Sequence, residues 1–108
     1  MIRLVPAAFA LFAATAAASD WPAWRGPTGQ GHSPDANVPL KWSATENVKW
    51  KVPLKDQGNS TPVVWKEHVF LTQANKGGSV RSLLCLSRAD GSLRWQKDVA
   101  YDGKEKNW

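Results

Sequence analysis

The clearest hydrophobic pattern in the chain is an alternation of apolar and polar residues at 48–54. The apolar side chains occupy every second position, as Val48, Trp50, Val52 and Leu54, and lysine or proline stands between them. A period of two is typical of a β-strand with one buried face, and a proline near the end of the strand suits an edge position. The pattern therefore predicts a half-buried edge strand over 48–54.

Four further β-prone runs follow, and they are separated by turn signals. These runs lie at 61–65, 69–72, 80–87 and 92–96. Three polar residues between the first two runs predict a hairpin, and Asp90-Gly91 before the last run is a strong hairpin turn signal. The segment 61–97 is therefore predicted to form a four-stranded up-and-down meander, with a length close to that of a β-propeller blade of about 40 residues.

The N-terminal segment has the pattern of a secretory leader. Arg3 precedes an apolar stretch at 4–14, and small residues with Ala16 and Ala18 at A-x-A spacing follow it. Crossing a bilayer core takes about 20 apolar residues, and this stretch is shorter. We therefore predict a signal peptide over 1–18, cleaved after Ala18, and a bacterial protein that is periplasmic or extracellular, with no transmembrane segment in its mature chain.

Composition and charge limit the classes of function. The chain has 108 residues, of which 43% are hydrophobic and 21% charged, which is too short for a multidomain enzyme and typical of a globular protein. The formal net charge is +5 at pH 7, but the basic residues are scattered, so a nucleic-acid partner is not expected. The single cysteine, Cys85, allows no disulfide framework and lies in an apolar run, so we expect a buried small side chain there.

Residues 19–47 are rich in proline, glycine, asparagine and serine, which predicts an irregular arm. The chain carries seven tryptophans against one tyrosine and three phenylalanines. Residues this large are retained mainly where they pack or stack, and we interpret them as packing residues that hold the arm and the sheets rather than as platforms for a sugar or a quinone.

The residues alone predict no catalytic, cofactor-binding or metal site. His32 and His68 have no cysteine or carboxylate at ligand spacing and are interpreted as surface histidines. The glycine cluster at 26–31 lacks the flanking strand, the helix and the lysine of a phosphate loop. Ser60 and Ser87 have no triad partner that can be recognised in the sequence.

The stretch at 80–95 resembles the pyrroloquinoline-quinone-like (PQQ-like) propeller repeat, in which an Ala-x-Asp-x-x-x-Gly-Lys-x-x-Trp motif closes each blade. Gly91 and Trp95 match this structural blade motif, whereas the Ala, Asp and Lys places are taken by Cys85, Ser87 and Ser92. The resemblance implies that Trp95 docks its ring against the neighbouring blade. Ser87 departs from the motif and puts in doubt the role of the aspartate side chain in that turn.

Other segments extend the resemblance to exported bacterial propellers, which are relatives of the propeller lipoprotein that assists β-barrel assembly in the outer membrane. They lie at 20–27, 47–51, 58–64 and 69–72. The fold implied is all-β, with antiparallel four-stranded blades of a quinoprotein-like β-propeller after an irregular arm. Within 48–108, the strand at 48–54 would close the last blade and 61–97 would form the first. Since a propeller needs at least four blades, the resemblance implies an N-terminal fragment.

The resemblance leaves two functions open. The favoured one is a noncatalytic scaffold or protein-binding module of the cell envelope, with no cofactor in this part of the chain and with protein or envelope partners, including self-association that completes a propeller. The alternative is a fragment of a PQQ-dependent alcohol or sugar dehydrogenase, in which the quinone lies on a tryptophan platform beside a calcium ion. Such dehydrogenases carry a vicinal cysteine pair that this sequence lacks.

Overall fold

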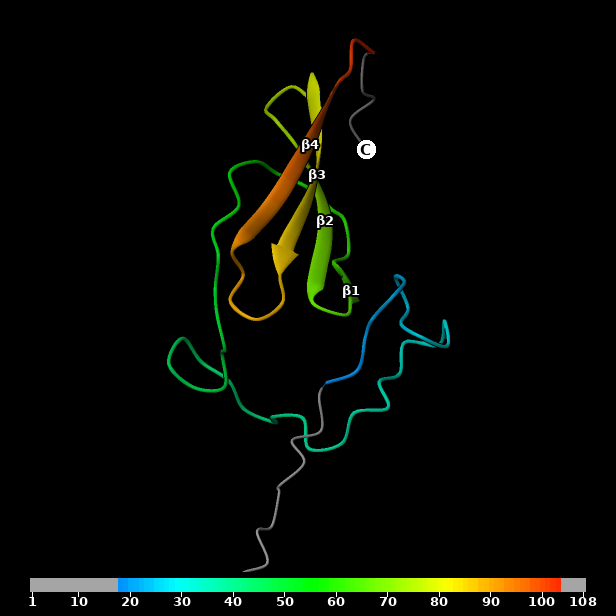
Figure 1. Cartoon of the computed structure of the whole chain (residues 1–108), viewed down its shortest axis with the longest axis vertical. Coiled ribbons are helices and arrows are strands. Elements are labelled where there is room, and N and C mark those ends of the chain that lie inside the picture. The colour runs from blue at the N-terminus through cyan, green and yellow to red at the C-terminus, as the bar shows by residue number, and fades with distance from the viewer. Residues whose placement is uncertain (1–17, 104–108) are drawn as a thin grey trace, which may run out of the picture.

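The computed structural model describes residues 18–103, and these residues form one antiparallel sheet without a helix (Figure 1). Its strands are β1 (Val63–Trp65), β2 (His68–Ala74), β3 (Val80–Ser87) and β4 (Leu93–Ala100). The strands lie in the sheet in chain order, and each pairs antiparallel with the next. The predictions of an all-β fold and of a four-stranded meander are confirmed. The predicted signal peptide lies outside the described residues, except for Ala18.

The strand register places the buried apolar residues on one face of the sheet, which we call the covered face. Val69 pairs with Leu86, and Leu71 pairs with Leu84, so that the four side chains project to the same side. Each is at most 9% exposed, and together they form the hydrophobic core of the described chain. The ring of Trp50, which is partly buried, packs against this cluster from outside the sheet.

The segment that carries Trp50, predicted as an edge strand over 48–54, forms no strand with the other described residues. No described residue pairs with it in a ladder, and it runs as an extended segment alongside the sheet (Figure 1). Trp50 and Val52 are the partly buried members of the alternating pattern, whereas Val48 and Leu54 are 44% and 46% exposed. Because the inward side chains lie between this backbone and the sheet, the two backbones do not come within hydrogen-bonding distance.

The chain before β1 continues along β2 by an irregular pairing. Gln57 forms an isolated antiparallel bridge with Ala74. Between that bridge and β1, the Ser60 hydroxyl replaces a backbone partner, since it accepts the Thr72 N–H at 2.9 Å and donates to the Thr72 carbonyl at 3.2 Å. The side chain thus satisfies backbone groups of β2 that a regular ladder would otherwise pair.

The two edges of the sheet are treated differently. On the β1 side, the Trp21 backbone exchanges hydrogen bonds of 2.8 and 2.9 Å with Val64, which places the start of the arm beside β1. On the other side, all eight residues of β4 are exposed, and within the described residues β4 pairs with β3 alone. β4 is therefore an open edge, at which Arg94 and Lys97 supply positive charges that oppose uncontrolled pairing.

The arm consists of turns, in which Ser43 and Glu46 form a small bridge. The expectation that tryptophans hold the arm by packing is wrong for Trp24 and Trp42, which are 75% and 71% exposed. Trp21, in contrast, lies against Gly26, where an added Cβ would come within 2.7 Å of its ring. In residues 18–103 no helix is long and apolar enough to cross a membrane.

Candidate functional site

The second face of the sheet, which we call the open face, carries large apolar side chains together with polar and basic ones such as Thr72, Arg81 and Lys97. The register places on it Val63, Trp65, Phe70, Leu83, Trp95 and Val99. Four of these large side chains are 40–64% exposed, namely Trp65, Leu83, Trp95 and Val99. Several exposed large apolar side chains on one face make that face a candidate for contact with another structural element, because isolated apolar residues are common on surfaces but groups of them are not.

Trp95 lies on the open face of the edge strand β4, opposite Cys85 in the ladder between β3 and β4. The rings of Trp95 and Phe70 lie 6.1 Å apart, measured between centroids, with their planes tilted by 51°. Cys85, which pairs with both residues, is fully buried, which confirms that it is a small packed side chain. Trp95 therefore covers the sheet with one part of its ring and presents the remainder to the exterior.

Gly91, the other residue that the resemblance singles out, has a backbone conformation and a location that exclude a side chain. Its φ is +74°, in the left-handed region, and its N–H donates to the Ser87 carbonyl at 2.8 Å. A Cβ at this position would lie 2.6 Å from Cε3 of Trp50 and 2.7 Å from Cγ2 of Val52. The glycine therefore joins the β3–β4 turn to the extended segment that crosses the covered face.

The β3–β4 turn obtains its carboxylate from Asp90. The Asp90 carboxylate accepts hydrogen bonds from the Ser92 N–H at 2.9 Å and the Ser92 hydroxyl at 2.7 Å. These two bonds and a further bond from the Ser87 hydroxyl lower the pKa of Asp90 to about 2, and the bond from the Ser92 backbone N–H has the largest effect. Ser87, at the aspartate place of the motif, is thus a donor in the turn, and Asp90 supplies the acceptor.

The lowered pKa of Asp90 predicts an acid-dependent loss of stability. A carboxyl whose pKa is depressed in the folded state stabilises the fold above its ordinary pKa of 3.8, and this contribution is lost as the pH falls toward 2. We expect Asp90→Asn, which keeps an acceptor but does not titrate, to flatten the fall in urea midpoint between pH 5 and pH 2. Asp102→Asn, at an exposed carboxyl, is the control and should retain the wild-type slope; equal slopes in all three proteins would contradict the assignment.

A cluster of polar side chains occupies the far end of the covered face. The Ser82 hydroxyl donates to the Asp98 carboxylate at 2.7 Å, and the Gln96 amide donates to the same oxygen at 2.7 Å. These bonds lower the pKa of Asp98, and the bond from Gln96 has the larger effect. The Ser82 hydroxyl donates directly to the Asp98 carboxylate, without an imidazole between the two groups that could act as a base. The cluster therefore cross-links β3 and β4 and does not form an activated nucleophile.

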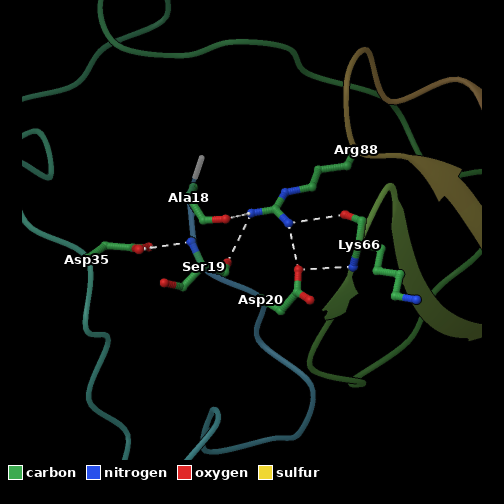
Figure 2. Close-up of polar contacts among 6 residues, drawn as sticks. All are labelled: Ala18, Ser19, Asp20, Asp35, Lys66 and Arg88. Carbon is green, nitrogen blue, oxygen red and sulfur yellow. Dashed lines mark hydrogen bonds and ion pairs between the residues drawn. The ribbon is translucent and has the colours of Figure 1, made fainter. Parts of the chain in front are cut away.

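Arg88 connects three distant parts of the chain (Figure 2). From the β3–β4 turn, its guanidinium forms an ion pair with Asp20 at 2.8 Å and donates to the Lys66 carbonyl at 3.1 Å. The same Asp20 carboxylate accepts the Lys66 N–H at 3.0 Å, where Lys66 has a left-handed φ of 51° in the β1–β2 turn. The guanidinium also donates to the carbonyls of Ala18 and Ser19, and so fixes the start of the arm against two turns.

The remaining polar residues singled out from the sequence do not converge. His32 is exposed, and His68 stacks on Phe70 with a centroid distance of 5.9 Å. Within residues 18–103 no group of histidine, cysteine and acidic side chains has the arrangement of a metal site. A groove of about 930 Å³ beside residues 57–59 is lined by Lys76, Arg81 and Lys97 and by no carboxylate or histidine. It offers a basic surface without an acid–base pair.

Comparisons with known proteins find no family model, no curated protein and no solved structure that matches this chain. The features available for a functional argument are therefore the open face, the turn at Gly91 and the contacts of Arg88. The sequence pattern points to Gly91 and Trp95 but not to Asp20 or Arg88. Their contacts join positions up to 70 residues apart, and no local spacing reports such pairs.

Proposed function

We propose that this chain provides the start of an exported PQQ-like β-propeller that acts as a noncatalytic scaffold or protein-binding module in the cell envelope. The observation that carries the proposal is that the two faces of the meander differ: one is covered by the extended segment 48–54, and the other is open and exposes large apolar side chains. In this proposal, β1 to β4 form the first blade, and Trp95 docks against the next one.

The position of the segment 48–54 supports this arrangement. Trp50 packs on the covered face, and Trp50 and Val52 meet the β3–β4 turn at Gly91, so that side chains and not a backbone ladder join the segment to the sheet. A strand of a neighbouring blade makes contact in this way, because stacked sheets are separated by a layer of side chains about 10 Å thick. The segment is thus suited to be the outer strand that closes the last blade against the first.

The use of polar side chains supports the noncatalytic part of the proposal. The carboxylates of Asp20, Asp90 and Asp98 are each engaged by hydrogen-bond donors that hold a turn or a strand pair. The donors to these carboxylates are guanidinium, backbone, hydroxyl and amide groups. Such donor–carboxylate pairs fix the conformation of the turns and strands that carry them. The exposed apolar side chains of the open face are, in contrast, suited to contact another protein element.

The open face predicts that the purified chain self-associates through it. We expect oligomers by light scattering at concentrations of tens of micromolar, because an apolar face this exposed is stabilised by contact with a second copy. Val99→Lys, which places a charge on the open face, should return the chain to a monomer and lower the binding of a dye specific for apolar surface. Val38→Lys, at an exposed valine of the arm, should leave both unchanged.

Two results would count against the proposed function. A chain that stays monomeric, or that associates equally well with and without Val99→Lys, would remove the argument for a blade-to-blade face. Saturable quenching of tryptophan fluorescence by pyrroloquinoline quinone in the presence of calcium would favour the dehydrogenase alternative. The expected result of that titration is no saturable binding.

A further inference from the structure

The backbone around Ala18 and Ser19 is held by side chains from two other parts of the chain (Figure 2). The Ser19 N–H donates to Oδ1 of Asp35 at 2.8 Å. On the opposite side, Nη2 of Arg88 donates to the Ser19 carbonyl at 3.0 Å and to the Ala18 carbonyl. These groups lie on both sides of the peptide bond at which the sequence predicts removal of the leader.

Negative charges outnumber positive charges around this peptide bond. Asp20 is paired with the Arg88 guanidinium. Asp35 receives its hydrogen bonds from Ser19 and Ser33, which are neutral groups, and these bonds lower its pKa together with the charge of Arg88. Lys66 contributes its backbone groups, and its ammonium group points away from the cluster in Figure 2. The cluster therefore has two carboxylates and one guanidinium.

We propose that Asp35 is the binding site for the α-ammonium group that cleavage after Ala18 creates on Ser19. The inference rests on the export that is part of the proposed function. Hydrolysis by a signal peptidase adds water across the bond between the Ala18 carbonyl carbon and the Ser19 nitrogen. The released leader keeps the new carboxylate of Ala18, and the Ser19 nitrogen takes up a proton to become the ammonium group.

The geometry already suits the cleaved product. The Ser19 nitrogen lies at 2.8 Å from Asp35, a distance typical of a charge-assisted hydrogen bond between an ammonium and a carboxylate. Arg88 loses the Ala18 carbonyl but keeps the Ser19 carbonyl and the Asp20 carboxylate. The new positive charge balances the second carboxylate of the cluster. Cleavage thus converts a hydrogen bond of the precursor into an ion pair that anchors the mature N-terminus.

The test uses the chain exported by a bacterial host and purified from its periplasm. Intact mass identifies the first residue, which we expect to be Ser19. The α-amine is then labelled with an acylating reagent at pH 7, with and without urea. The Asp35 carboxylate raises the pKa of the α-amine above its ordinary value, so labelling should be about fivefold to tenfold slower in the folded chain than in urea. Asp35→Asn should abolish most of this difference, and Asp102→Asn should preserve it.

The outcomes separate this inference from the proposed function. A chain that stays in the cytoplasm with its leader attached would overturn both the inference and the proposed export, and a periplasmic chain that keeps its leader would overturn the inference alone. A mature chain that starts at Ser19 but is labelled equally fast with and without urea, or equally fast in the wild type and in Asp35→Asn, would overturn the inference alone. A chain that starts at a different residue would also overturn it, because the Ser19 nitrogen would then not be the terminal amine.

Discussion

Gly91→Ala should lower the free energy of unfolding by about 2–4 kcal/mol, as the sum of backbone strain and overpacking. The φ of +74° is costly for any residue with a Cβ, and the added methyl group would lie 2.6 Å from the Trp50 ring. The ring cannot retreat without losing its contact with the core. Urea denaturation followed by far-UV circular dichroism measures the change, and a loss of this size is a large part of the stability of a small domain.

Gly29→Ala is the matched control for this prediction. Gly29 also has a positive φ, of 72°, but no atom lies within 4 Å of the position that its Cβ would take. Its substitution therefore carries the cost of the backbone conformation alone, about 1 kcal/mol. If the two variants lost equal stability, the close approach between Gly91 and Trp50 would not contribute, and the segment 48–54 would not be fixed on the covered face.

The strands of the meander could be predicted because their signals are local. The Asp90-Gly91 turn and the β-prone runs on either side of it specify one hairpin, and the structure has β3 and β4 there. The segment 48–54 shows the limit of this reasoning. Its alternation correctly indicates that Trp50 and Val52 face inward, but the same period describes an extended segment packed by its side chains and a strand paired by its backbone.

The contacts of Arg88 could not be predicted for a different reason. Arginine in a polar turn is typical of a solvated surface, and the sequence contains many basic residues that are exposed. Arg88 differs from them because the fold brings Asp20 and the Lys66 carbonyl within reach of its guanidinium. The Asp20 and Arg88 side chains are 68 positions apart, so their pairing follows from the tertiary arrangement and from no local pattern.

The tryptophans show most clearly that residue type alone does not determine structural role. Trp24, Trp42 and Trp50 are identical in chemistry, and the first two are more than 70% exposed, whereas the third packs on the core. A high tryptophan count therefore indicates that packing occurs somewhere but does not indicate which ring packs. This difference in exposure follows from the strand register, which creates an apolar cluster under Trp50 and under neither of the other two tryptophans.

Trp50→Ala should lower the free energy of unfolding by about 2–4 kcal/mol, somewhat less than a fully buried aromatic ring would lose. The substitution removes the ring from the covered face and leaves the Arg88 carbonyl without the indole N–H that donates to it at 2.8 Å. Trp50→Phe should cost less, because it keeps most of the apolar contact and loses the hydrogen bond, worth about 1 kcal/mol. Urea unfolding followed by far-UV circular dichroism avoids any dependence on the removed fluorophore.

Trp42→Ala is the control that gives the comparison its meaning. Its ring is 71% exposed, so its removal should change the free energy of unfolding by less than about 0.5 kcal/mol. A loss of stability in Trp42→Ala equal to that in Trp50→Ala would mean that the arm, and not the covered face, carries the packing of the tryptophans. The expected difference instead places the stabilising contact between 48–54 and the sheet.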